Sequence, residues 1–448
     1  HKSQLSTNDL TQLKEPDEIS GAFATFYKKL YSNTDTCTEF EQIDAYLESI
    51  NLPKLSEEDS QAIDRTIMRE EIVETIKGLK NGKSPGSDGY CNEFYKAFVD
   101  DISPILEKAY AYAFERGEFP PNWKETIILV IHKEGKDPTE CSSYRPIALQ
   151  NSDCKILTSI LAKRLKTVIT TLVHQDQTGF ITGRQLSDNI RRLLNVMSYA
   201  KSKPVPCMAL ALDAEKAFDH VSWPFLFSVL RKYGLGPGFI KWVQQLCSSP
   251  KASVWVNVCF SQKILLGRGC RQGDPLSPLL FALSIEPLAQ LIRDSTDISG
   301  IEVSGEEHRL SLYADDVIVY ISDPTKSVPN LMKCTETFGF YSGYKINVTK
   351  TEALPMNNLI SPQMKSAFSF RWPREGIRYL GINIPPDLSL YQSNYIKIID
   401  KIKHDLNHWN TLPLTLIGRV EAVRMNVLPR LLFLFRTQSL RLNLLLVF

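Results

Sequence analysis

The chain has 448 residues, of which 43% are hydrophobic and 23% are charged, and its formal net charge is +2. This composition excludes a disordered or fibrous protein, and the length predicts two or three linked subdomains. Nine cysteines without a Cys-x-x-Cys pair argue against a disulfide or structural zinc framework and favour a reducing compartment. Because no signal peptide is evident and the first residue is His1, we expect a piece of a longer product.

The charge is unevenly distributed along the chain. Residues 1–75 hold 7 Lys and Arg against 16 Asp and Glu, a net charge of −9, so the remaining residues carry +11. Apolar spacing predicts helices at Ile19–Tyr31 and Glu70–Leu79 with acidic outer faces. We therefore predict an acidic helical N-terminal extension over residues 1–75. The basic remainder suits a polyanionic partner, although excess Lys and Arg is more often ordinary surface.

A strand, a flap and a long helix follow. Residues Thr126–Ile131 are β-branched and apolar and predict a strand, and apolar residues at helical spacing predict an amphipathic helix over 156–172. Between them lies a polar loop flanked by Lys133 and Arg145. These two cations would hold a triphosphate if the loop closes as a flap, and each alone also fits an ordinary surface residue.

Two carboxylates, Asp315 and Asp316, lie between apolar runs in the tetrapeptide Tyr313–Asp316, a pattern that predicts a β-hairpin. A third, Asp213, ends the apolar strand Cys207–Leu212. An Asp pair alone is more often a solvated turn, but a second strand ending in a carboxylate favours two-metal phosphoryl transfer. The sequence thus predicts Asp213, Asp315 and Asp316 as ligands of two Mg²⁺ ions, with Mn²⁺ as the alternative.

Three other residues are candidates for the same reaction. Phe218 lies five positions past Asp213, where a bulky ring would exclude the 2′-hydroxyl of an incoming sugar, and its alternative role is core packing. Gln272 lies in the glycine-rich segment Gly269–Pro275, which would support a base and sugar-phosphate or simply open a helix. Lys350 is the candidate general acid that protonates departing pyrophosphate.

The remaining elements indicate a mixed α/β core that ends in a helical region. The proline pair Pro385-Pro386 marks a boundary before that region. From residue 401 on there are 7 Lys and Arg against 2 Asp and Glu, which suits a phosphate backbone and a solvated helix face equally. We predict helices at 223–233, 239–247, 276–293, 395–409 and 416–435, and strands at 253–258 and 379–384.

Two patterns are interpreted as decoys, and a third segment is weighed as a membrane span. Gly78–Ser84 imitates a phosphate loop, but it has one residue too few between its glycines and follows a helix pattern. His404–His408 resembles a zincin helix, but no third ligand is evident. The Leu-rich end from residue 431 is interrupted by Arg436 and Arg441, so we expect no membrane span.

Taken in order, the motifs of this chain resemble those of reverse transcriptases of non-long-terminal-repeat retrotransposons, the long interspersed element type. The resemblance runs from about residue 15 to residue 435. It is carried by Lys83–Gly89, Tyr144–Ile147, Asp176–Phe180, Leu212–Asp219, Arg271–Pro278, Tyr313–Asp316, Gly343–Lys350 and Tyr379–Gly381.

The resemblance implies an α/β (α+β) right-hand polymerase. Fingers would span residues 76–206. A palm, whose antiparallel sheet packs on helices, would span residues 207–384, and a helical thumb, which we expect to be truncated, would span residues 385–448. It also implies that Gln272 contacts the nucleotide and Phe218 acts as the sugar gate. Nucleic-acid contacts would come from a template segment that includes Gly179 and Phe180, and from a primer grip at Tyr379, Leu380 and Gly381.

The implied function is RNA-directed DNA polymerisation with an RNA template, a DNA primer or nicked target DNA, and dNTPs. The family further implies a nuclear location with a cytoplasmic ribonucleoprotein stage, no membrane partner, and an endonuclease domain in the full-length polyprotein. Two alternatives remain. One is a catalytically inactive nucleic-acid-binding relic, and the other is an RNA-copying RNA polymerase, which Phe218 disfavours.

Overall fold

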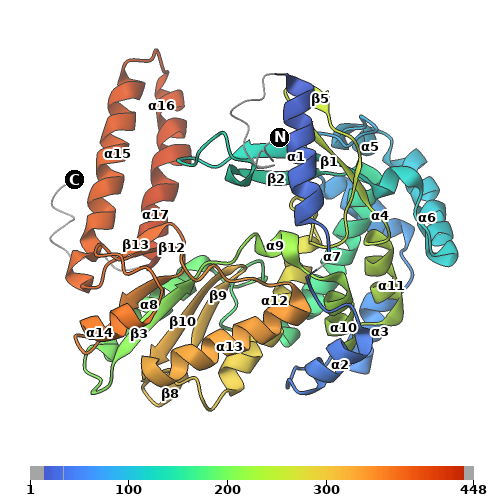
Figure 1. Ribbon diagram of the computed structural model, residues 1–448. Helices are drawn as coiled ribbons and strands as arrows, with labels where there is room; N and C mark the ends of the chain where they lie inside the picture. The colour runs from blue at the N-terminus through green and yellow to red at the C-terminus, as the bar shows by residue number, and fades with distance from the viewer. Residues whose placement is uncertain (1–14, 34, 438–448) are drawn as a thin grey trace, which may run out of the picture.

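The structure is a computed structural model that describes residues 15–33 and 35–437. Figure 1 shows three groups of elements. A four-stranded sheet lies at the base, a five-stranded sheet stands on one side, and a group of C-terminal helices stands on the other. Those helices are α15 (Ser393–Asn410), α16 (Leu416–Ala422) and α17 (Leu428–Thr437), with a π-turn at Val423–Val427 between the last two. This mixture of helices and sheets confirms the predicted α/β (α+β) fold class.

The four-stranded sheet is antiparallel throughout and is buried on both faces. Because side chains alternate along a strand, Leu210 packs into one hydrophobic cluster with helices α12 (Ser277–Asp294) and α13 (Pro324–Ser342). Ala209 packs into a second cluster with α8 (Leu186–Ala200). Apolar residues at every position of the central strands are the sequence pattern of such a sheet. Its strands are, in spatial order, β11 (Glu352–Pro355), β3 (Cys207–Leu212), β10 (Asp316–Ser322) and β9 (Leu310–Tyr313).

The five-stranded sheet combines segments that are far apart in sequence. Helix α1 (Pro16–Leu30) covers one of its faces. The parallel pairing of β1 with β4 brings residues 251–265, part of the stretch predicted as palm, into the same sheet as residues 125–149. The domain boundaries themselves stay a prediction. The strands are β2 (Tyr144–Leu149), β1 (Glu125–His132), β4 (Lys251–Val256) and β5 (Cys259–Phe260), with β6 (Ile264–Leu265) paired to β4.

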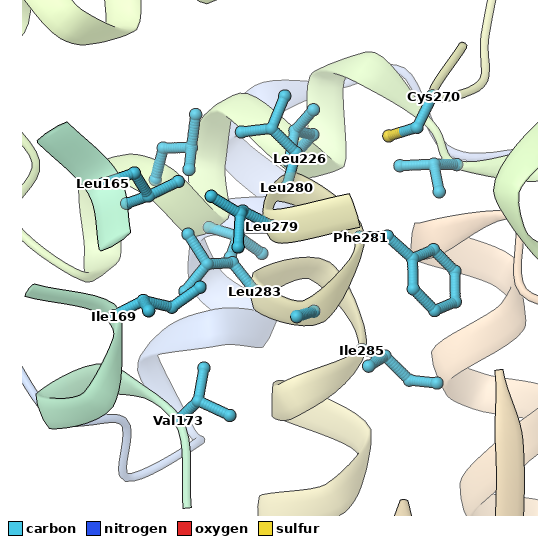
Figure 2. Packing of buried hydrophobic residues seen from close by; sticks show 14 of the residues in the cluster. Leu165, Ile169, Val173, Leu226, Cys270, Leu279, Leu280, Phe281, Leu283 and Ile285 are labelled. Carbon is cyan, nitrogen blue, oxygen red and sulfur yellow. The ribbon is translucent and has the colours of Figure 1, made fainter. Parts of the chain in front are cut away.

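Helix α12 (Ser277–Asp294) is the central buried helix. Its apolar residues point in several directions, and Figure 2 shows Leu279 and Leu283 facing Leu165 and Ile169, while Phe281 points away from them. A helix that is apolar on all sides must be covered on all sides. Its neighbours include α7 (Ser152–Leu172), α10 (Trp223–Lys232) and α13 (Pro324–Ser342).

The remaining elements are shorter or lie at the periphery. They are α2 (Phe40–Glu48), α3 (Glu57–Asp64), α4 (Arg69–Gly78), α5 (Asn92–Ala97), α6 (Val99–Arg116), α8 (Leu186–Ala200), α9 (Ala217–His220), α11 (Pro237–Leu246), α14 (Pro362–Ala367), β7 (Ile301–Val303), β8 (Glu306–His308), β12 (Ile377–Tyr379) and β13 (Ile382–Ile384). Over residues 15–33 and 35–437, no helix combines the length and the apolar character that crossing a bilayer requires.

One predicted element is wrong. Residues 379–384 were expected to form a single strand, but β12 and β13 pair antiparallel as a hairpin. The turn between them has positive φ at Leu380 (48°) and at Gly381 (84°). Two consecutive positive φ values define a tight hairpin turn, which Gly381 favours and the apolar pattern alone does not reveal.

Candidate active site

The three predicted acidic residues lie at one end of the four-stranded sheet. Strand β3 ends at Leu212, which pairs with Val317 of β10, so the next residue, Asp213, lies beside the β9–β10 turn that carries Asp315 and Asp316. The turn is tight, because Asp316 pairs directly with Tyr313. Antiparallel register therefore brings together carboxylates that are about a hundred residues apart in sequence.

The electrostatics of these carboxyl groups reflect their crowding. Burial raises the pKa of Asp315, and the charge of Asp213 raises it further. The pKa of Asp316 rises to about 6, first through burial and then through the charges of Asp315 and Asp213. A bound divalent cation would remove this repulsion, and carboxylate oxygens are the donors that Mg²⁺ prefers.

The three side chains do not form a closed cage. No group of three or more His, Cys, Asp or Glu side chains that could hold a metal ion occurs within residues 15–33 and 35–437. Sites for Mg²⁺ in nucleotide enzymes use one or two carboxylates completed by substrate phosphates, so the donor set fits such an ion. Which of the three residues bind it stays a prediction.

Positive charge faces this acidic end from the flap. Arg145 pairs with Ile131 near the tip of the β1–β2 hairpin, and its guanidinium partly offsets the raised pKa of Asp315. Lys133 lies at the same tip, and its pKa is lowered by burial and by the charges of Arg145, Lys136 and Lys350. The structure therefore brings two predicted cations, Arg145 and Lys350, within electrostatic range of the third, Lys133.

The segment that contains Lys350 is tied to the strand end at Asp213. The backbone N–H of Asn347 donates to the Asp213 carbonyl (2.8 Å), and the N–H of Asp213 donates to Thr351 Oγ1 (3.3 Å). Tyr344, in the same segment, is buried and its hydroxyl has no hydrogen-bond partner in the described part of the chain. Burial raises its pKa, as do the charges of all three acidic residues, so this hydroxyl lies beside the acidic end.

Phe218 belongs to a group of aromatic rings beneath the acidic end. It stacks on Phe281 of α12 with ring centroids 4.2 Å apart, so the core-packing role applies. Its ring also lies edge-on to Phe180, at 6.3 Å between centroids, and Phe180 lies at the same distance from Tyr313. Phe180 is 46% exposed and Phe218 is half-buried, so both rings also present a surface.

Gly179 packs directly against the backbone of the β9–β10 turn. A Cβ added to Gly179 would overlap the backbone nitrogen of Ala314, so only glycine allows this approach. The Oε1 of Gln177 accepts hydrogen bonds from the N–H groups of Gly179 (2.8 Å) and Ala314 (3.0 Å). Gln177 was not predicted as a site residue, although its place in the Asp176–Phe180 motif offered a signal.

Gln272 contacts a buried carboxylate, Asp219, that was not predicted as a site residue. Its Nε2 donates to both carboxylate oxygens of Asp219 (3.4 and 3.3 Å), and the Tyr31 hydroxyl donates to Asp219 Oδ1 (2.9 Å). Burial raises the pKa of Asp219 to about 6, partly offset by the charge of Lys216. Tyr31 comes from the acidic N-terminal region, a contact across 188 residues that no local pattern reveals.

The predicted primer-grip residues differ in exposure. Tyr379 is buried in the core beneath β10, whereas Leu380 is half-buried and Gly381 is exposed at the hairpin turn. Of these three residues, only those of the turn therefore offer a surface.

The two decoy segments lie on helices and not in the acidic end. Gly78 ends helix α4, and the histidines of His404–His408 are exposed on α15.

A four-stranded antiparallel sheet with carboxylates at one end, facing a cationic hairpin of a second sheet, defines a right-hand polymerase. The family model described as reverse transcriptase (RNA-dependent DNA polymerase) matches residues 131–384, and the chain belongs to this family. This match spans the predicted acidic, cationic and nucleotide-contacting positions from Lys133 to Lys350.

Similar proteins come from retrotransposons, which confirms the resemblance stated from the motifs. The chain is 29% identical over 431 residues, 95% of its length, to a transposon TX1 uncharacterized 149 kDa protein of Xenopus laevis, and covers 32% of it. It is 32% identical over 274 residues, 60% of its length, to a probable RNA-directed DNA polymerase from transposon BS of Drosophila melanogaster, and covers 29% of it. A polyprotein of the type-1 element R2 of Popillia japonica is 25% identical over 387 residues, 82% of the chain and 51% of that relative. The chain spans about a third of the first two relatives.

Proposed function

We infer that this chain is the RNA-directed DNA polymerase of a retrotransposon. It extends a DNA primer, or the end of a nicked target DNA, with dNTPs on an RNA template. The observation that carries this inference is the register of β3 and β10, since it unites Asp213 with the Asp315–Asp316 turn opposite Arg145. Family membership supports the same reaction.

Asp213, Asp315 and Asp316 are the residues that would hold Mg²⁺, or Mn²⁺ in its place. Bound divalent ions supply activation of the attacking primer hydroxyl and neutralise charge that grows on the leaving pyrophosphate. Lys133 and Arg145 orient the triphosphate from the flap side and offset its negative charge. Lys350 is the group that delivers a proton to the departing pyrophosphate oxygen.

The remaining site residues select and position the substrates. The ring of Phe218, fixed on Phe281, occupies the space that a ribose 2′-hydroxyl needs, so the site prefers dNTPs. Gln272, held by Asp219, supports the base and sugar of the nucleotide. Gly179 and Phe180 contact the template, and the Leu380–Gly381 turn, supported by buried Tyr379, contacts the primer. A nuclear stage and a cytoplasmic ribonucleoprotein stage follow from a retrotransposon origin.

The experiment is primer extension on a homopolymer RNA template with and without Mg²⁺. Asp213→Asn and Asp315→Asn should each abolish extension, because each removes one charged ligand of the metal ions. Binding of the primer–template should persist in both variants. Asp297→Asn is the matched control, since the Asp297 side chain is exposed and forms a surface ion pair with Lys326 (3.1 Å). Extension that survives in either site variant would overturn the assignment of the acidic end.

The same assay distinguishes an active polymerase from the alternative, a catalytically inactive relic. A wild-type chain that binds primer–template but never extends it would be a nucleic-acid-binding relic.

The variant Phe218→Val tests the second alternative, an RNA-copying RNA polymerase. A smaller side chain should raise the use of ribonucleotides relative to deoxynucleotides. An unchanged ratio would remove the sugar-gate role from Phe218 and leave the polymerase assignment intact.

A further inference from the structure

The N-terminal helix α1 ends against the segment that carries Gln272. The carbonyl of Tyr31, the residue that follows the helix, accepts a hydrogen bond from the N–H of Gly267 (3.0 Å). The carbonyl of Leu30 accepts one from Arg268 Nε (2.8 Å). Helix α1 belongs to the predicted acidic extension and lies outside the stretch that the reverse transcriptase family model matches. Its contact with the Gln272 segment therefore does not follow from the family match.

The Tyr31 side chain extends this contact to a buried carboxylate. Its hydroxyl donates to Asp219 Oδ1 (2.9 Å), and both residues are buried, with Tyr31 8% and Asp219 2% exposed. The two oxygens of the same carboxylate also accept from Gln272 Nε2, at the longer distances of 3.4 and 3.3 Å. Hydrogen bonds to a charged acceptor are shorter and stronger than neutral ones. Of these two partners, Tyr31 therefore holds Asp219 more firmly.

The backbones around this carboxylate are fixed by other contacts. A Cβ on Gly269 would lie only 2.8 Å from the Asp219 carbonyl oxygen, so the two segments are in close contact there. The carbonyl of Gln272 accepts a hydrogen bond from the N–H of Ala148 in β2 (2.8 Å). With both backbones held, the orientation of the Gln272 side-chain amide depends on its partner, Asp219.

The charge of Asp219 decides which end of the Gln272 amide faces it. An ionised carboxylate only accepts hydrogen bonds, so it takes the amide nitrogen and leaves the amide oxygen for a substrate. A protonated carboxyl group also carries a donor, which can bind the amide oxygen and reverse the amide. The Tyr31 hydroxyl stabilises the ionised form, because it donates to it. The end of α1 thus favours one orientation of the amide.

A second contact from α1 acts on the same charge. Lys216 lies just before α9 with a positive φ (43°), and its Nζ is 4.3 Å from the centroid of the Phe26 ring and 5.6 Å from that of Tyr27. This Nζ is buried and has no hydrogen-bond partner within the described residues. Aromatic faces attract a cation. The charge of Lys216 lowers the pKa of Asp219, so α1 helps to keep that charge near the carboxylate.

We propose that Tyr31 is a positioning residue for the incoming dNTP: it fixes Asp219 as the carboxylate that orients the Gln272 amide toward the nucleotide. Tyr31 acts through these two side chains and not by contact with the nucleotide. This inference rests on the proposed function, in which Gln272 supports the base and sugar. The end of α1 is thereby a supporting part of the nucleotide pocket.

The test measures equilibrium binding of the next dNTP to a complex whose primer ends in a dideoxynucleotide, so that no bond can form. Tyr31→Phe removes a single oxygen atom. Its affinity for the dNTP should fall roughly fivefold, because a hydrogen bond to a charged acceptor is lost, while its affinity for the primer–template stays the same. Tyr110→Phe is the matched control and should leave both affinities unchanged. It removes another buried hydroxyl, which donates to the Asp153 carbonyl (2.7 Å) from α6.

A double-variant cycle separates positioning from a general loss of stability. Gln272→Ala removes the side chain through which Tyr31 acts. In that background Tyr31→Phe should cause no further loss of dNTP affinity, because coupled residues do not contribute additively. A purely structural role of Tyr31 would lower the affinity by the same factor in both backgrounds.

The pH dependence of dNTP binding gives a second readout. Burial raises the pKa of Asp219 to about 6, and the hydrogen bond from Tyr31 lowers it, so Tyr31→Phe should raise this pKa. On acidification from about pH 7 to about pH 5.5, dNTP affinity should therefore fall at a higher pH in Tyr31→Phe than in the wild type. Lys216, whose pKa is about 8, keeps its charge over this range. The charged and titratable groups that face Asp219 are Lys216, Lys133 of the flap, Tyr27, Tyr31 and Cys270.

Three results would overturn the proposal: an unchanged dNTP affinity in Tyr31→Phe, an equal effect in the Gln272→Ala background, or an identical pH dependence in Tyr31→Phe and the wild type. Extension of an unblocked primer reports the proposed function separately. A wild-type chain that binds the dNTP in a Tyr31-dependent manner but never extends would refute the polymerase assignment and leave the positioning role standing. A wild-type chain that binds no dNTP would refute both.

Discussion

The two sheets of this molecule differ in how their faces are covered. The four-stranded sheet packs hydrophobic clusters on both faces and carries its charged groups only at one end. The five-stranded sheet is covered by α1 on one face, whereas on the other, the open face, Ile127 and Leu149 are half-buried. A sheet buried on both sides can hold repelling carboxylates at fixed positions, whereas a half-covered sheet holds its side chains less firmly.

The largest expected effect concerns matched leucines in the two sheets. Leu210 of β3 is fully buried, so Leu210→Ala should lower the free energy of unfolding by about 2–5 kcal/mol through lost burial and a cavity. Leu149 lies on the open face and is half-buried, so Leu149→Ala should cost about 1 kcal/mol or less. Denaturant unfolding of both variants provides the measurement. Equal losses would mean that the open face is covered in solution.

The same contrast explains which parts of the site could be predicted from sequence. The apolar strand before Asp213 and the apolar runs around Asp315 are local patterns, and they predicted β3, β9 and β10. A sheet buried on both faces gives nearly continuous apolar runs, which are easy to recognise. The acidic end was therefore predicted without structural information.

Long-range pairing was the part that sequence could not supply. Nothing local in Lys251–Val256 indicates a parallel partner in β1, because register depends on the whole sheet. The contact of Tyr31 with Asp219 is likewise set by packing of distant segments. The β12–β13 hairpin was missed since Leu380 adopts a positive φ that an apolar residue rarely has.

The second prediction contrasts charged groups near the two sheets. Glu286 is buried in α12, accepts a hydrogen bond from Arg293 (2.8 Å), and has a pKa raised to about 7, chiefly by burial and also by the charge of Asp176. The folded chain therefore binds this proton more tightly than the unfolded chain. The stability that Glu286 contributes is complete below about pH 4.5 and is lost as the pH rises to about 7.

Glu286→Gln should remove this pH dependence, since the amide is neutral throughout. Between pH 4.5 and 7 the wild-type chain should lose up to about 3 kcal/mol that the variant does not lose. Glu125→Gln in the five-stranded sheet is the comparison, because Glu125 forms a partly exposed ion pair with Lys263. Its effect should stay within about 0.5 kcal/mol at every pH. Denaturation at a series of pH values gives both curves, and parallel curves for wild type and Glu286→Gln would refute the assignment.

The smallest expected effect concerns the turns of the two hairpins. In the β4–β5 turn both Asn257 (φ 49°) and Val258 (φ 69°) adopt positive φ, and Val258 is 87% exposed. A β-branched residue is strained in that region, and its exposed side chain gains little from packing. In the β9–β10 turn Ala314 also has a positive φ (55°), but it is buried and its N–H donates to Gln177.

Val258→Gly should therefore stabilise the chain by about 1 kcal/mol, because glycine adopts this conformation without strain. Ala314→Gly should gain less, since glycine adds freedom to the unfolded chain and the native turn already has packing and a hydrogen bond to hold it. Denaturation midpoints of the two variants measure the difference. A larger gain in stability at Ala314 than at Val258 would mean that the acidic turn is the more strained of the two. The buried packing of Ala314 and its hydrogen bond to Gln177 would then not be enough to hold the carboxylates in place without strain.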